Sequence, residues 1–181
     1  MTHAVTPGGD GMVLHLVTRV IHWLTVMMLV GSFAIVWSIG WLPAGPARVQ
    51  AVGLHRTIGM LVLVVTVLRL LWWLASQRTP RIGMSPWRWA AGVVHTALLC
   101  SLLITPLLGW TYTNARGHTL LLFGIRLPSL IFKDRYFARV AIETHEFMAY
   151  ALLTLISAHV AAALWHHFVL HDATLKRMWR G

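Results

Sequence analysis

Four long apolar segments constrain the fold of this 181-residue chain more than any other feature. They cover about residues 14–42, 52–74, 87–112 and 140–169, and each is longer than the roughly 20 residues that a helix needs to cross a bilayer. Because lipid offers no hydrogen-bond partners to the backbone, such segments must form helices. The sequence therefore predicts one all-α domain over residues 1–181, an integral membrane four-helix bundle with up-down connections.

The composition supports lipid as the surrounding medium. Only 11% of the residues are charged and 57% are hydrophobic, whereas about 25% of the residues in a soluble domain are charged. A net charge of +10 also occurs in nucleic-acid-binding proteins, but here the basic residues lie in the gaps between apolar segments. The ten Trp are concentrated near the segment ends, where indole rings favour the headgroup region. These features argue against a nucleic acid as the partner.

Charge distribution gives only a weak signal for orientation. With both termini on one side, that side has eight basic residues and the other has seven, namely Arg48, Arg56, Arg116, Arg126, Lys133, Arg135 and Arg139. The positive-inside rule therefore gives no strong preference. The short, densely basic connection between the second and third segments and the basic tail favour a cytoplasmic location for both termini. The first segment is too long for the 7–15-residue core of a secretory signal, so we expect it to be retained.

Five of the 11 histidines, namely His22, His55, His95, His145 and His159, lie well inside the apolar segments and away from their ends. A lone imidazole is costly there unless it lines a site. In an up-down bundle, His22 lies one or two helical turns inside the membrane face on which both termini lie. His55 lies near the opposite membrane face. His145 and His159 are 14 residues apart, which corresponds to about 21 Å of rise and almost four turns, so they share one helix face. The depths therefore match in two pairs, His55 with His145 and His22 with His159.

Two imidazoles from facing helices at each of two levels are typical of two six-coordinate haems inside a bundle. Neutral imidazole is a good iron ligand, and its second ring nitrogen can bond a carbonyl group that fixes the tautomer. The spacing predicts two haems with these four histidines as axial ligands. A single haem or a metal transport path is the alternative. Transport would favour acidic ligands within the membrane, and only Glu143 and Glu146 approach it.

Further cofactor-binding candidates lie near these levels. His95 has a depth close to that of His22 and could bond a haem propionate, line a quinone pocket or replace His22 as a ligand. Arg19, one turn before His22, and Arg69, near the same side, could pair with propionates of that haem. Arg56 could serve the haem at the other level in the same way. Snorkelling to lipid headgroups is an equally good interpretation of Arg69.

Several stretches of the sequence occur together in one known family. They are Arg19-Val-Ile-His22-Trp23, His55-Arg-Thr-Ile-Gly59 through Arg69, His95 with Pro106 and Gly109, Asn114-Ala-Arg116-Gly117, Thr144-His145-Glu146 through His159 to His166-His167, and Asp172-Ala-Thr-Leu175. With these motifs, which extend from about residue 12 to the end, the sequence resembles the bacterial cytochrome b561 family of four-helix diheme membrane cytochromes.

The resemblance implies two b haems with the ligand pairs given above, a bacterial inner-membrane location and single-electron exchange with ubiquinone. A relative within this family oxidises superoxide on the periplasmic side, and the basic residues opposite the termini would attract such an anion. Anchoring of these residues to lipid headgroups explains them equally well. Related membrane subunits of hydrogenases and formate dehydrogenases pass electrons to quinone together with catalytic partners.

Three interpretations of the function therefore stay open. The first is a stand-alone oxidoreductase that acts on superoxide or quinone. The second is an electron-relay subunit that needs a redox partner protein. The third is a haem-free bundle with a role in metal transport or structure. Buried histidines at two matched levels favour the first two interpretations over the third.

Overall fold

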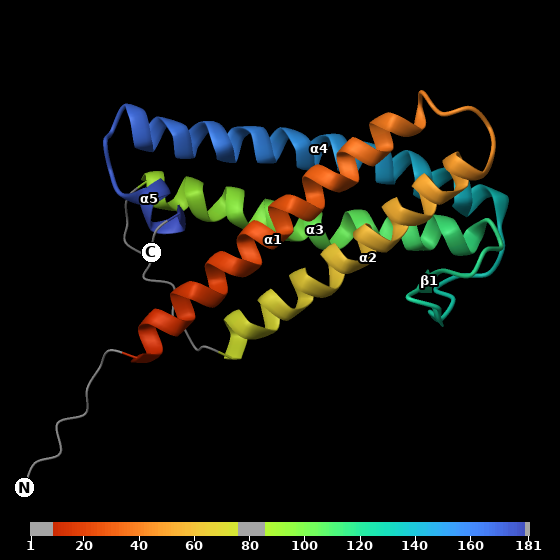
Figure 1. The fold of residues 1–181 in the computed structure, drawn as a ribbon, viewed down its shortest axis with the longest axis horizontal. Helices are drawn as coiled ribbons and strands as arrows, with labels where there is room; N and C mark the ends of the chain where they lie inside the picture. Colours follow the sequence, from red (N-terminus) through yellow and green to blue (C-terminus); the bar gives the residue numbers. More distant parts are fainter. Residues whose placement is uncertain (1–8, 76–85, 180–181) are drawn as a thin grey trace, which may run out of the picture.

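The computed structural model describes residues 9–75 and 86–179 of the chain. Four long helices run up and down, and a short β-hairpin and a short final helix accompany them (Figure 1). The elements are α1 (Gly9–Ile39), α2 (Pro46–Ala75), α3 (Pro86–Ala115), β1 (Leu121–Leu122), β2 (Ile125–Arg126), α4 (Arg135–Phe168) and α5 (Thr174–Trp179). The prediction of an all-α four-helix membrane bundle is confirmed, and the hairpin is an addition that the sequence did not predict.

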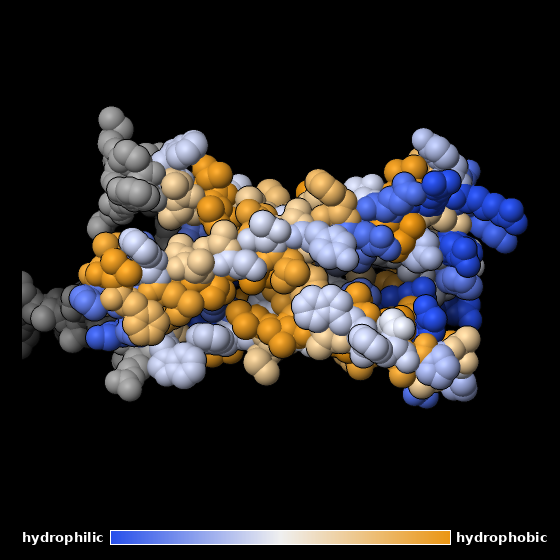
Figure 2. Space-filling view, turned by 90° about the horizontal axis from the view of Figure 1, so that it is seen from above, coloured by the Kyte–Doolittle hydropathy of each residue, from blue (hydrophilic) through white to orange (hydrophobic). Residues whose placement is uncertain are grey.

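All four long helices contain a stretch that is long and apolar enough to cross a membrane. These stretches are Leu16–Ile39, Pro46–Ala75, Trp89–Ala115 and Arg135–Phe168. Figure 2 shows apolar side chains over the middle of the molecule and hydrophilic side chains gathered at the end that carries the β-hairpin. A water-soluble protein rarely exposes so continuous an apolar surface. The chain is therefore a multi-pass membrane protein.

Three helices begin five or six residues earlier than the sequence predicts, and one of them is α1, which begins at Gly9 rather than near residue 14. Helix α2 begins at Pro46 rather than near residue 52. Proline suits the first helical position, because its φ is preset and its missing N–H would be unpaired there. Helix α4 begins at Arg135 rather than near residue 140. The carboxylate of Asp134 caps α4 by accepting hydrogen bonds from two amides of the first turn, at 2.7 and 3.0 Å, which stabilises the additional turn.

The helices pack as two pairs. Helix α1 packs along α2, α3 packs along α4, and contacts between α2 and α3 join the pairs. Among the described residues, the Cα atoms of α4 stay more than 8 Å from nearly all those of α1 and α2. Helix α4 is therefore held by α3 and α5 and stands apart from the first two helices.

A small apolar cluster lies at the middle of the bundle, and we call it the central cluster. Its buried members come from α2, α3 and α4, and partly buried side chains from all four long helices surround them. The cluster consists of Val62, Leu102 and Leu152, surrounded by Met28, Leu29, Ile58, Leu98 and Ile156. Leu152 is seven residues from both His145 and His159, so the central cluster separates the two depths at which these histidines lie.

Two histidine levels as the candidate cofactor site

The five membrane histidines gather at two depths, one on each side of the central cluster. We call the depth nearer the β-hairpin the hairpin level. It holds His55 of α2 and His145 of α4, whose ring centres are 6.2 Å apart with perpendicular ring planes. Arg56 lies close enough to interact electrostatically with His55. The structure thus brings together the two histidines that the spacing pairs at this depth.

The terminal level is the depth near the start of α1 and the end of α4. Here the ring centres of His22 and His159 are 6.4 Å apart, and those of His95 and His159 are 5.3 Å apart. Arg69 of α2 is near both His22 and His159. Three histidines and one arginine from four different helices therefore meet at this level.

The two cross-bundle pairs have the separation that a shared metal ion requires. Two imidazoles on opposite sides of one metal, each with a bond of about 2 Å, have ring centres about 6 Å apart. His55/His145 and His22/His159 meet this requirement, and α4 stands apart from α1 and α2. The ring separations of both pairs are therefore compatible with one metal ion held between each pair of imidazoles.

His95 and His159 do not meet the same requirement. Their rings are closer together, and they belong to α3 and α4, which pack directly against each other. This geometry favours a place for His95 beside a cofactor rather than on its axis. In the described part of the chain, no three His, Cys, Asp or Glu side chains form a group that could hold a metal ion by themselves.

Hydrogen bonds orient both rings of the hairpin level. Nδ1 of His145 lies 2.8 Å from the carbonyl oxygen of Thr105. A carbonyl only accepts, so this nitrogen must donate, which leaves Nε2 of the neutral ring free to bind iron. Nδ1 of His55 lies 3.0 Å from Oγ of Ser32. Such partners hold a metal-ligating imidazole in one tautomer and one orientation.

Gly109 of α3 lets the ring of His145 approach the helix. A Cβ atom at this position would lie 3.2 Å from Cε1 and 3.3 Å from Nδ1 of His145. That is closer than ordinary van der Waals contact, so any side chain would press on the ring. The sequence assigned no role of its own to this glycine, because nothing local shows that a histidine 36 residues later packs on it.

Arginine side chains of the terminal level can receive an anionic group. Nε of Arg19 is buried and has no hydrogen-bond partner among the described residues, and Arg19 is one turn before His22. An unpaired buried guanidinium nitrogen is costly, and a carboxylate such as a haem propionate would satisfy it. The residues at both levels therefore fit a haem.

Ser32 is a candidate site residue that sequence reasoning missed. A signal for it exists: Ser32 and His55 lie about equally far from the α1–α2 connection, so an antiparallel helix pair places them at one depth. Thr105 and His145 are likewise equally far from the α3–α4 connection, so their common depth had the same signal. The contact between the Thr105 carbonyl and the His145 ring also depends on how α3 and α4 are rotated against each other.

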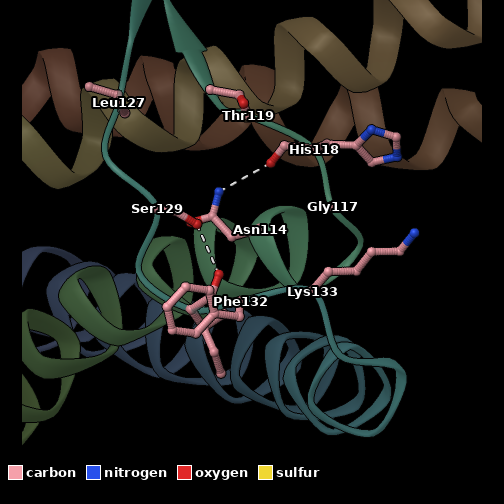
Figure 3. Close-up of a pocket in the computed structure, with 9 residues that line it drawn as sticks. Asn114, Gly117, His118, Thr119, Leu127, Ser129, Phe132 and Lys133 are labelled. Atoms are coloured by element: carbon pink, nitrogen blue, oxygen red, sulfur yellow. Dashed lines mark hydrogen bonds between the residues drawn. The ribbon is translucent and has the colours of Figure 1, made fainter.

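A shallow pocket of about 250 Å³ opens in the connection between α3 and α4 (Figure 3). The side chain of Asn114 organises this connection, because it donates to the carbonyl of His118 at 3.1 Å and accepts from the amide of Leu130 at 2.9 Å. The side chains of His118 and Lys133 extend away from Asn114 (Figure 3). The pocket is polar and partly basic, and none of the five membrane histidines lines it.

Comparison with known proteins gives the same family over almost the whole chain. The family model described as prokaryotic cytochrome b561 matches residues 13–181. The chain is 31% identical to "Cytochrome b561 homolog 2" of Escherichia coli (strain K12) over 172 residues, which is 90% of this chain and 88% of that protein. It is 29% identical to "Cytochrome b561 homolog 1" of the same organism over 164 residues, with 87% and 92% coverage.

A third relative has a name that specifies an activity. It is the "Probable superoxide oxidase CybB" of Yersinia pestis, which is 27% identical over 161 residues, covering 87% of this chain and 90% of that protein. The matched family implies b-type haem and a role in membrane electron transfer, which agrees with the fit of the two histidine levels. Given its four apolar helices and these matches, the chain belongs to the prokaryotic cytochrome b561 family.

Proposed function

We propose that this chain is a diheme b-type cytochrome that transfers single electrons between a periplasmic donor and ubiquinone, with the hairpin end facing the periplasm of the bacterial inner membrane. The proposal depends mainly on the two cross-bundle histidine pairs. The ring centres are 6.2 Å apart in the His55/His145 pair and 6.4 Å apart in the His22/His159 pair, and the pairs lie at two depths. When bound, each haem supplies a one-electron iron couple at its level.

Four histidines are the proposed haem ligands. His55 and His145 would hold the haem of the hairpin level, and His22 and His159 would hold that of the terminal level. Two imidazole ligands for each haem would favour electron transfer over oxygen binding. The partners of His55 and His145, Ser32 and the Thr105 carbonyl, keep the hairpin-level rings in the binding orientation.

The arginines and His95 have supporting roles in this proposal. Arg19 and Arg69 would balance the propionate charge at the terminal level, and Arg56 would do so at the hairpin level. His95 lies beside His159, with ring centres 5.3 Å apart, on the helix that packs directly against α4. It therefore donates a hydrogen bond to a propionate or to a quinone rather than binding iron.

The central cluster separates the two levels by apolar side chains. Leu152 lies seven residues, or about 10 Å of rise, from each histidine of α4. Leu152 and Val62 are 3% and 4% exposed, so they exclude water from the middle of the bundle. In this proposal the central cluster keeps water and ions from passing between the two levels, whereas an electron can pass from one haem to the other.

The hairpin end suits an anionic donor. Arg116, Arg126, Lys133 and Arg135 lie in or next to its connection, and Figure 2 shows hydrophilic side chains gathered there. Three acids lie near this end, and two of them are already engaged, since Asp134 caps α4 and Glu143 pairs with Arg139 at 2.8 Å; Glu146 is the third. The remaining positive charge would attract a small anion and raise its encounter rate. Superoxide, which the name of the Yersinia relative suggests, is the donor we propose.

The test is a reduced-minus-oxidised visible spectrum of the purified protein, with haem quantified per chain. We expect about two b haems per chain, and we expect the chain to reduce ubiquinone when superoxide is supplied. His118→Ala is a matched control, because this exposed histidine belongs to neither level. A folded chain without haem would contradict the proposal. A diheme chain that reacts with neither superoxide nor quinol would instead be a relay subunit.

A further inference from the structure

The short helix α5 folds back under the end of α4 at the terminal end of the bundle (Figure 1), and its last residues contact α1. The indole Nε1 of Trp23 donates to the carbonyl of Met178 at 3.0 Å, and Nη2 of Arg19 donates to the carbonyl of Trp179 at 3.1 Å. The rings of Trp23 and Trp179 meet edge to face with their centres 5.3 Å apart. Three contacts thus join segments that are 155–160 residues apart in the sequence.

Asp172 holds the turn that precedes α5. One carboxylate oxygen is 2.5 Å from Nδ1 of His166 at the end of α4, and the other accepts from the amide of Thr174 at 2.8 Å. The hydrogen bond with His166 keeps the pKa of the Asp172 carboxyl below its ordinary value, so the group is charged at neutral pH. His171 has a φ of 51°, which non-glycine residues rarely adopt. Side-chain contacts therefore hold this turn in an otherwise unfavourable conformation.

The residues that α5 contacts flank a histidine of the terminal level. The ring of Trp23 lies 5.6 Å from the ring of His22, and Arg19 is one turn before His22 on the same helix. By accepting from one terminal nitrogen of Arg19, the carbonyl of Trp179 orients the guanidinium, whose buried Nε stays unpaired among the described residues. Helix α5 thus fixes the two side chains that border His22 on α1.

We infer that α5 is a cap that positions the side chains of the terminal level, and that Asp172 is the positioning residue that keeps this cap in place. The effect on a haem rests on the proposed function. Asp172 acts through the turn on α5, and α5 acts through Trp23 and Arg19 on His22. The hairpin level has internal partners instead, since Ser32 and Thr105 bond its rings directly. The two levels are therefore oriented by different means.

Limited trypsin digestion tests the cap without any need for haem. Helix α5 contains Lys176 and Arg177, and cleavage there requires local opening of the helix. We expect Asp172→Ala to speed this cleavage, read by intact mass, by about 10-fold, because it removes the carboxylate that bonds both the His166 ring and the amide of Thr174, the first residue of α5. Asp172→Glu should restore most of the protection. An unchanged cleavage rate in Asp172→Ala would overturn the role of Asp172.

Two further variants distinguish a specific loss of the cap from general loosening of the protein. Trp23→Phe keeps an aromatic ring but cannot donate to the Met178 carbonyl, so it should also speed cleavage if the cap depends on α1. Glu143→Gln removes a carboxylate from an exposed ion pair at the other end of α4 and should leave the rate unchanged. Equal acceleration in Glu143→Gln would mean general loosening of the protein, which contradicts a specific cap.

The positioning effect is tested by low-temperature electron paramagnetic resonance and redox titration of the diheme protein. We expect Asp172→Ala to keep both haems but to shift the signal and midpoint potential of one of them, namely the haem that His22→Ala removes. If the tail is released while both haems keep their signals, α5 is a cap without a positioning role. If wild-type protein holds no haem, the proposed function and the positioning effect both fail, whereas the tryptic result still decides whether the cap exists.

Discussion

The hairpin level and the terminal level contain the same chemical groups in different settings. At the hairpin level two histidines each have one hydrogen-bond partner inside the bundle, and Gly109 gives one ring its place. At the terminal level three histidines and Arg69 meet, and a helix from outside the four-helix bundle contacts Arg19 and Trp23 beside His22. The first setting orients each ring directly, whereas the second depends on charge and on a remote segment. We therefore expect the two levels to respond differently to matched changes.

The largest effect is expected from removal of an axial ligand. His145→Ala should lower haem from about two to about one per chain, because iron loses one of its two imidazoles at the hairpin level. The remaining haem should keep the signal of the terminal level, read by electron paramagnetic resonance. His167→Ala, which changes a histidine of the same helix outside both levels, is the control. Retention of both haems in His145→Ala would contradict the assignment of one haem to each histidine level.

A methyl group next to the His145 ring should have the next largest effect. Gly109→Ala places a carbon atom 3.2 Å from this ring, and such overpacking costs about 1–3 kcal/mol. We expect partial loss of the hairpin-level haem and a lower thermal unfolding midpoint. Gly92→Ala in the same helix meets nothing within 4 Å and should be neutral or slightly stabilising, since alanine favours helix. Similar behaviour of the two variants would show that His145 does not need Gly109.

Loss of one hydrogen bond should have a smaller effect. Ser32→Ala removes the hydroxyl that lies 3.0 Å from Nδ1 of His55, and loss of such a partner weakens metal binding by about 10-fold or more. We expect weaker haem retention at the hairpin level alone, measured by titrating apo-protein with haem. Ser32→Thr keeps a hydroxyl and should bind haem nearly as well as wild type. Weakening at both levels would argue against independent orientation of the rings.

The smallest effect is expected at His95, the histidine that the geometry places beside the cofactor. His95→Ala should keep about two haems per chain and change only the potential of the terminal-level haem. His159→Ala at the same level should lose a haem. If His95→Ala loses a haem and His22→Ala does not, His95 and not His22 is the axial ligand, and the pairing of the terminal level has to be revised.

The depth of each candidate ligand was predictable because depth depends on local geometry. Rise and residues per turn are constant along a helix, so His145 and His159 had to share a face about 21 Å apart. The up-down order then matched each of them in depth with a histidine of α2 or α1. The boundaries were less accurate, because caps such as Asp134 extend a helix beyond its apolar segment.

Lateral arrangement was not predictable to the same degree. The sequence placed His95 at the right depth, but only the structure shows its ring 5.3 Å from that of His159. It also shows Gly109 against His145 and Asp172 against His166. These contacts depend on how helices rotate and cross, which follows from the packing of many side chains rather than from any single motif.

The sequence by itself determined that the chain crosses a membrane four times and carries histidines at two depths. Both properties follow from apolar length and helical periodicity, which act within one segment at a time. The tertiary structure decided which rings face each other, which nitrogens are oriented by Ser32 and Thr105, and where α5 lies. These outcomes require residues from distant segments to compete for the same space, and only the folded chain resolves that competition.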